Sequence, residues 1–121
     1  MKSAVFNIDR EYNCDVLVCG GGISGFASAV ASARQGADTI LIESGGFLGG
    51  TATKGLVGPF MTCYDAEGKE RIIKGLYLEL EKRLLELNGA VAADQCLGSN
   101  SYNGYRPMGH KGVMPFDGEI I

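Results

Sequence analysis

The chain has 121 residues and a net charge of −3, from 11 Lys and Arg against 14 Asp and Glu. A length of this order holds one small domain, and without a basic patch nothing indicates nucleic-acid binding. Residues 1–13 lack the apolar core of a signal peptide, and no apolar run approaches the roughly 20 residues of a membrane span. We therefore expect a cytoplasmic protein with no membrane partner. Its 19 glycines predict much backbone in tight turns or close to a ligand.

The first predicted elements are a strand, a glycine-rich turn and a helix. An apolar run at residues 16–19 leads directly into the turn at residues 20–25, which reads GGGISG. The alanine-rich segment that follows ends at Gly36. Its Gly25, Ala29 and Ala33 are spaced by four, so they fall on one smooth face of a helix that can lie close to a sheet.

A second apolar run, residues 39–42, predicts another strand and ends at Glu43. A strand, a glycine turn, a helix and a strand with an acid at its tip form the dinucleotide-binding fingerprint. Gly20 would permit the tight turn, Gly22 would let the backbone approach a pyrophosphate, and Gly25 would let the helix pack closely. The positive end of the helix would face the phosphates. Glu43 comes at close to the spacing of roughly 20 residues that is expected for an acid that binds a ribose.

The segment after Glu43 bears on which nucleotide is bound. A nicotinamide cofactor needs nothing special here, whereas a cofactor that extends past its pyrophosphate needs backbone without side chains, which Gly49 and Gly50 provide. An NAD(P)-binding Rossmann domain therefore stays an alternative. An S-adenosylmethionine methyltransferase also has a glycine turn and a strand-end acid, but the spaced alanines and the glycine pair argue against it.

Together, the turn glycines, the spaced alanines, the acid and the glycine pair resemble the N-terminal FAD-binding pattern of flavoproteins with two dinucleotide-binding domains. Residues 48–57 are similar to the same segment of bacterial FAD-dependent oxidoreductases, which are distantly related to fumarate reductase flavoproteins. The resemblance implies an FAD-dependent oxidoreductase in which hydride passes between a small-molecule substrate and the bound flavin.

The resemblance also implies a set of FAD contacts. Residues 20 and 22–24 would line the pyrophosphate, Glu43 with Ser44 beside it would hold the adenosine ribose, and residues 49–51 would approach the diphosphate and the ribityl chain. The full set predicted to bind FAD is Gly20, Gly21, Gly22, Ile23, Ser24, Gly25, Glu43, Ser44, Gly49, Gly50 and Thr51. No catalytic residue and no metal ligand is predicted.

Lys54 and Cys63, which follow the glycine pair in the sequence, each have both a functional and a structural interpretation. Lys54 would stabilise a reduced, anionic flavin if it lies near the ring, or it is a surface lysine. Cys63 would have a redox role near the flavin, or it is a small buried residue. The four cysteines have neither metal-like nor CxxC spacing, so we expect no disulfide framework, and Cys14 and Cys19 are expected to pack beside the first strand.

A second helix is predicted within residues 72–89. Its apolar stripe is spaced by three and four from Ile73 to Leu87 and indicates core packing. Glu79 and Arg83 form a favourable pair on the exposed side. We expect the helix to begin near Ile73 and to end at the Asn-Gly pair that follows Leu87.

Residues 90–121 show no periodicity, and Arg106 and His110 stand out among their glycines and prolines. Arg106 could bind a carboxylate substrate and His110 could exchange a proton near a flavin, or the loop packs only within a larger protein. Because only two parallel strands are predicted, we expect an α/β, Rossmann-like FAD-binding βαβ unit at residues 13–60 in an incomplete domain. We expect the chain to be an N-terminal fragment of a larger flavoprotein that is inactive by itself, or else a non-catalytic remnant. The substrate and the oligomeric state stay open.

Overall fold

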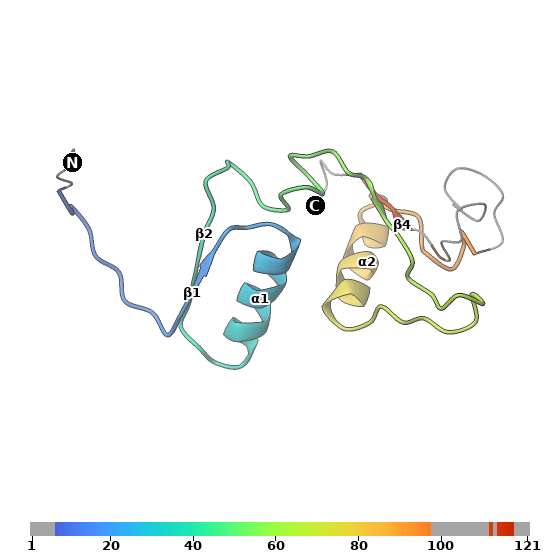
Figure 1. Ribbon diagram of the computed structural model, residues 1–121, viewed down its shortest axis with the longest axis horizontal. Coiled ribbons are helices and arrows are strands. Elements are labelled where there is room, and N and C mark those ends of the chain that lie inside the picture. Colours follow the sequence, from blue (N-terminus) through green and yellow to red (C-terminus); the bar gives the residue numbers. More distant parts are fainter. Residues whose placement is uncertain (1–6, 98–111, 113, 118–121) are drawn as a thin grey trace, which may run out of the picture.

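The computed structural model describes residues 7–97, 112 and 114–117. The elements follow one another as β1 (Val16–Cys19), α1 (Ile23–Arg34), β2 (Thr39–Ile42), β3 (Pro59–Phe60), α2 (Leu76–Glu86) and β4 (Met114–Pro115). Figure 1 shows α1 between the sheet of β1 and β2 on one side and α2 on the other. Within the described residues, no helix has both the length and the apolar character needed to cross a membrane.

The strands β1 and β2 pair in parallel, with Val16 opposite Thr39 and Cys19 opposite Ile42. The chain between them forms α1, which packs on one face of this sheet (Figure 1). The close approach of α1 depends on Gly25, because a Cβ at that position would lie 1.8 Å from the carbonyl oxygen of Gly20. The structure thus confirms the predicted βαβ unit with parallel strands.

The structure has two halves, one formed by β1, α1 and β2 and the other by β3, α2 and β4 with their connecting segments. The second half holds the apolar core. Cys63, Leu84, Ala93 and Met114 form a buried cluster to which α2, β4 and the neighbouring segments contribute. β3 and β4 pair antiparallel in a separate sheet, with Phe60 opposite Met114. β4 therefore forms within the region in which the sequence shows no periodicity. A two-residue strand is too short to carry an alternating pattern, and its partner lies far away in the sequence.

The helix α2 begins at Leu76, so the prediction that it begins near Ile73 was wrong. Gly75 has a φ of +68°, which is incompatible with a helix. The N–H group of Ile73 donates instead to the carbonyl oxygen of Cys63 at 3.3 Å. The middle of the predicted stripe does pack, because Leu84 is 2% exposed, whereas Leu87 at its end is exposed.

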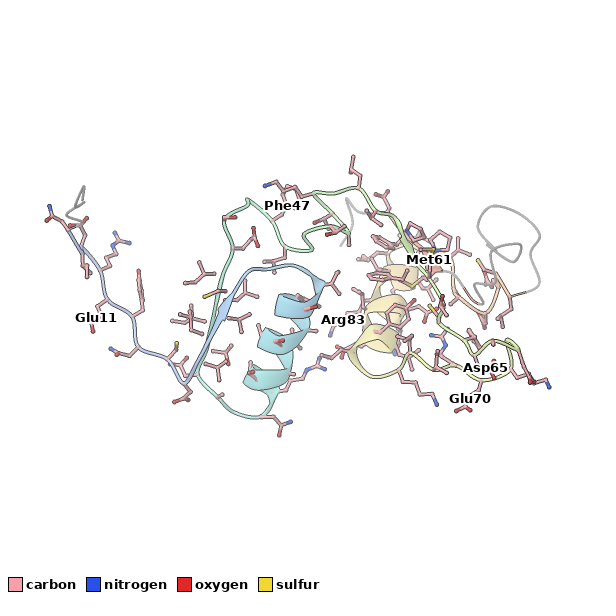
Figure 2. The ribbon with its side chains drawn as sticks, viewed as in Figure 1. Glu11, Phe47, Met61, Asp65, Glu70 and Arg83 are labelled. Atoms are coloured by element: carbon pink, nitrogen blue, oxygen red, sulfur yellow. The ribbon has the colours of Figure 1, made fainter. Side chains whose placement is uncertain are left out.

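The two halves meet at a charged group between α1 and α2. Glu79 of α2 forms ion pairs with Arg34 of α1 at 2.7 Å and with Arg83 at 2.8 Å, so the predicted pair of Glu79 and Arg83 is confirmed. Figure 2 shows Arg83 on the side of α2 that faces α1. Hydrogen bonds from Arg34 and then Arg83 lower the pKa of Glu79 to about 2. Exposed pairs of this kind contribute little to stability.

A buried ion pair ties α2 to the segments on either side of it. The two terminal guanidinium nitrogens of Arg71 donate to the Glu81 carboxylate, and the N–H group of Ala93 donates to the same carboxylate at 2.9 Å. Burial by itself would raise the pKa of Glu81, but the hydrogen bonds from Arg71 and Ala93 outweigh it, and the pKa is lowered. This carboxylate therefore joins three segments while only 4% of the residue is exposed.

We predict that Glu81→Gln lowers the free energy of unfolding by about 3 kcal/mol, because it leaves Arg71 partly buried without its counter-charge. Urea unfolding measures the change. Glu79→Gln is the matched control, since it removes a carboxylate of the same helix whose ion pairs are more exposed than that of Glu81, and its effect should be much smaller. Because the pKa of Glu81 is lowered, its contribution is present above the usual glutamate pKa of about 4.3 and is lost as the pH falls through the folded-state pKa. Equal losses in the two variants would contradict this prediction.

Candidate functional site

The turn after β1 contains glycines that the fold needs and one that it does not need. Gly20 has a φ of +100°, and its N–H group donates to the carbonyl oxygen of Ile42 at 2.7 Å. Gly22 has a φ of −64°, and a Cβ added there would meet no atom of the chain within 4 Å. The fold therefore requires glycine at Gly20 and Gly25 but not at Gly22. The space beside Gly22 is open, which is where a ligand could approach the backbone.

The same turn leads into an uncapped helix end. Gly22 is the N-cap residue of α1 and provides no side-chain hydrogen bond, and the first turn of the helix contains no acidic residue. The N–H groups of Ile23, Ser24 and Gly25 have no acceptor within the helix, as in any first helical turn. These donors and the positive end of the helix dipole favour an anion next to the open side of Gly22.

Glu43 lies at the end of β2 and binds the glycine turn. Its Oε2 accepts a hydrogen bond from the N–H group of Gly21 at 2.6 Å, and its Oε1 accepts one from the N–H group of Gly45 at 2.7 Å. The hydrogen bond from Gly21, followed by that from Gly45, lowers the pKa of Glu43, with smaller contributions from Ser44 and the charge of Lys54. The Ser44 hydroxyl donates to Oε1 as well, at 3.3 Å, whereas Oε2 keeps a second lone pair, through which Glu43 can still accept a ribose hydroxyl group.

The glycine pair lies directly against the turn. Gly22 and Gly49 form a parallel bridge, and the N–H group of Gly49 donates to the carbonyl oxygen of Gly21 at 2.8 Å. A Cβ on Gly50 would lie 2.9 Å from the Cα of Gly22. Both glycines of the pair have positive φ, +102° at Gly49 and +57° at Gly50. The structure thus brings together two glycine motifs that are well separated in the sequence, and Thr51 follows them as an exposed residue.

Among the other predicted residues, Ser24 and Ser44 are exposed and Gly21 is buried. Leu48 and Glu43 cover Gly21, because a Cβ there would lie 2.4 Å from Leu48 Cδ2. The hydrogen bond between Gly21 and Glu43 was missed by sequence reasoning, which assigned both residues to the cofactor. The correct spacing of the turn and the strand-end acid was a signal that the two groups come close.

The structure also locates the residues that had two interpretations. Cys63 is 1% exposed, and its Sγ lies 3.0 Å from the Tyr77 hydroxyl. Burial raises the pKa of the Cys63 thiol, which disfavours the reactive thiolate, so the structure supports a packing role. Lys54 is exposed, and its charge acts on Glu43. Cys19, expected to pack beside β1, is exposed. Arg106 and His110 lie outside the described residues.

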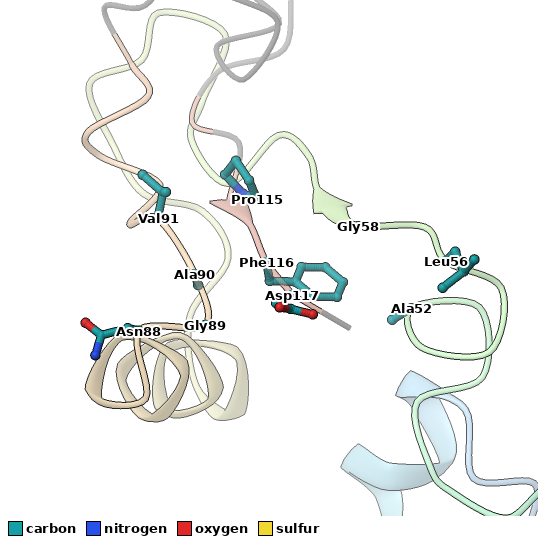
Figure 3. Close-up of a pocket in the computed structure, with 10 residues that line it drawn as sticks. All are labelled: Ala52, Leu56, Gly58, Asn88, Gly89, Ala90, Val91, Pro115, Phe116 and Asp117. Carbon is teal, nitrogen blue, oxygen red and sulfur yellow. The ribbon is translucent and has the colours of Figure 1, made fainter. Parts of the chain in front are cut away.

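A groove of about 520 Å³ begins one residue after Thr51. Figure 3 shows Ala52 and Leu56 on one side, the end of α2 on the other, and the ring of Phe116 pointing toward Ala52. The residues that line it are Ala52, Leu56, Gly58, Asn88, Gly89, Ala90, Val91, Pro115, Phe116 and Asp117. Sequence reasoning missed this groove, because no spacing rule connects segments so far apart in the chain.

The comparisons with known proteins identify the family. The family model described as FAD dependent oxidoreductase matches residues 15–119, which is most of the chain. The match includes the glycine turn, Glu43, the glycine pair and the groove. No curated protein and no solved structure matches the chain. The family resolves the choice between FAD and NAD(P) that the sequence left open. The chain belongs to the FAD dependent oxidoreductase family, and FAD is its cofactor.

Proposed function

We propose that the chain binds FAD across the glycine turn and that hydride passes between a small-molecule substrate and the bound flavin. The observation that carries the proposal is the open side of Gly22, which lies next to the uncapped end of α1. Gly49 and Gly50 pack against Gly22 itself. These groups fit a diphosphate, which needs hydrogen-bond donors and a close approach to the backbone. FAD, when bound, supplies the hydride chemistry, and the protein supplies binding and orientation.

The diphosphate would be held by the N–H groups of Ile23, Ser24 and Gly25. Two features support this assignment. No side chain caps the helix in their place, and no acidic residue in the first turn opposes a bound anion. The N–H group of Gly21 is not part of this set in our proposal, because it already donates to Glu43.

The adenosine ribose would be held by Glu43. The hydrogen bonds from Gly21 and Gly45 orient its carboxylate, and its lowered pKa keeps it ionised at neutral pH. An ionised carboxylate only accepts hydrogen bonds, which suits the two hydroxyl groups of a ribose. Ser44 is exposed beside it, and its hydroxyl lies 3.3 Å from Glu43 Oε1.

The ribityl chain would pass along Gly49, Gly50 and Thr51 toward the groove that begins at Ala52 (Figure 3). The volume of the groove lies within the roughly 300–1,000 Å³ that is typical of small-molecule sites. Its position one residue beyond the predicted cofactor contacts supports a role in binding the reactive end of the cofactor or the substrate. We assign no catalytic residue.

The reaction is tested by anaerobic reduction. The chain loaded with FAD is mixed with separate hydride donors, including NADH, NADPH, simple alcohols, amines and hydroxy acids. We expect one class of donor to bleach the visible absorbance of the flavin, because a single reduction removes the oxidised chromophore and does not require catalytic turnover by the chain alone. A chain that holds FAD but is reduced only by dithionite would support the alternative of a non-catalytic remnant. A chain that holds no FAD would contradict the binding proposal itself.

We predict that Gly22→Val weakens FAD binding on the order of a hundredfold or more and leaves the fold intact. The Cβ of a valine there would enter the open space beside the turn and meet no atom of the chain within 4 Å. Flavin titration measures the affinity and far-UV circular dichroism measures the fold. Gly46→Val is the matched control, because its Cβ also meets no atom within 4 Å and we assign Gly46 no cofactor contact. Unchanged FAD binding in Gly22→Val would reject the proposed diphosphate site.

We predict that Glu43→Ala weakens FAD binding roughly ten- to a hundredfold, because charge-assisted hydrogen bonds to the ribose are lost. Flavin titration at several pH values tests the charge. Since the pKa of Glu43 is lowered, affinity should stay level down to the usual glutamate pKa of about 4.3 and fall only below it. A Glu43→Arg variant that gains affinity for NADPH would favour a nicotinamide site here and contradict the assignment.

A further inference from the structure

Thr53 is buried although it lies outside the apolar core. It is 4% exposed and sits in the turns that follow the glycine pair, in no strand or helix. Its hydroxyl donates to the carbonyl oxygen of Leu48 at 2.6 Å. A buried hydroxyl is costly unless it is hydrogen-bonded, so this contact is the reason that threonine is tolerated at the position. The bond closes a short loop of chain that contains both glycines of the pair.

The side chain of Thr53 also packs against the first glycine of the pair. A Cβ on Gly49 would lie 2.4 Å from Thr53 Cγ2 and 2.6 Å from its Oγ1. Gly49 has a φ of +102°, a conformation that a glycine leaves easily because it has few steric restraints. The hydroxyl fixes the residue before Gly49 and the methyl group covers Gly49 itself. Thr53 thereby restrains the segment that donates a hydrogen bond to Gly21 and touches Gly22.

We propose that Thr53 is a positioning residue for the cofactor. It acts through the Leu48 carbonyl and holds Gly49 and Gly50 in the one conformation that leaves the open side of Gly22 accessible to a diphosphate. Its burial keeps it from touching the cofactor directly. This inference rests on the proposed FAD site and adds a residue to it that no glycine or acid pattern contains. Valine at this position keeps the shape and loses the donor, whereas serine keeps the donor and loses the methyl group.

The first measurement needs no cofactor. Amide hydrogen exchange in the ligand-free full chain reports on the Gly49 N–H group, which donates to Gly21. Thr53→Val should speed exchange at Gly49 roughly 3- to 10-fold, the effect of losing one hydrogen bond, and Thr53→Ser should not. The N–H group of Gly20, which donates to Ile42, should exchange at the same rate in all variants and serves as the internal reference.

The second measurement is FAD titration of the same variants. Thr53→Val should weaken binding roughly 3- to 10-fold, and Thr53→Ser should restore most of the affinity. Thr39→Val is the matched control, because Thr39 also donates its hydroxyl to a carbonyl, that of Ala37 at 3.1 Å, away from the glycine pair. It should leave the affinity unchanged.

Three results would overturn the role of Thr53: wild-type affinity in Thr53→Val, equal losses in Thr53→Ser and Thr53→Val, or an equal loss in Thr39→Val. Unchanged exchange at Gly49 in Thr53→Val would overturn it as well, even if that variant binds FAD more weakly. A wild-type chain that binds no FAD would instead reject the proposed site, and with it the role of Thr53 toward the cofactor. The exchange rates at Gly49 would then show whether the restraint on the loop exists independently of FAD.

Discussion

The site depends on the carboxylate of Glu43, which joins the end of β2 to the turn after β1. Its two oxygens accept N–H groups from Gly21 and Gly45, so one side chain fixes both the turn and the loop that follows β2. These hydrogen bonds also separate two anionic groups. The carboxylate uses one donor before the start of α1 and one after β2, so the N–H groups in the first turn of α1 remain for a diphosphate. Without this division, two negative groups would compete for the same donors.

The glycines of the site divide into those that the fold requires and one that it does not. Gly25 lies too close to the Gly20 carbonyl to carry a side chain, and Gly50 lies too close to Gly22. Gly49 needs its positive φ and lies under Thr53. Gly22 alone in this group has an ordinary φ and open space beside it. Because this open space adjoins the free N–H groups at the start of α1, a ligand that comes close to the backbone best explains the glycine at this position.

The parts of this structure that sequence predicted are those set by local spacing. The two strands, α1 and the close contact of Gly25 follow from periodicity and from the fixed geometry of a βαβ turn. The start of α2 was misplaced because the stripe continues through Ile73 while the backbone at Gly75 cannot be helical. The bond from Thr53 to Leu48 and the groove beside Phe116 were not foreseen, because they arise from how loops fold back in space.

The part of the cofactor site at the glycine turn and the apolar core occupy different halves of the structure. No residue of α1 is buried, and on the face of the sheet away from α1 the residues Leu17 and Ile42 are 54% and 53% exposed. The buried cluster around Leu84 lies in the other half. The βαβ half is therefore held mainly by its backbone ladder and by the hydrogen bonds of Glu43. A ligand that binds only the folded form stabilises it by about 2.7 kcal/mol at a hundred times its dissociation constant. Because FAD would contact the turn, the end of β2 and the glycine pair at once, its binding energy would reinforce the half of the molecule that buries the least.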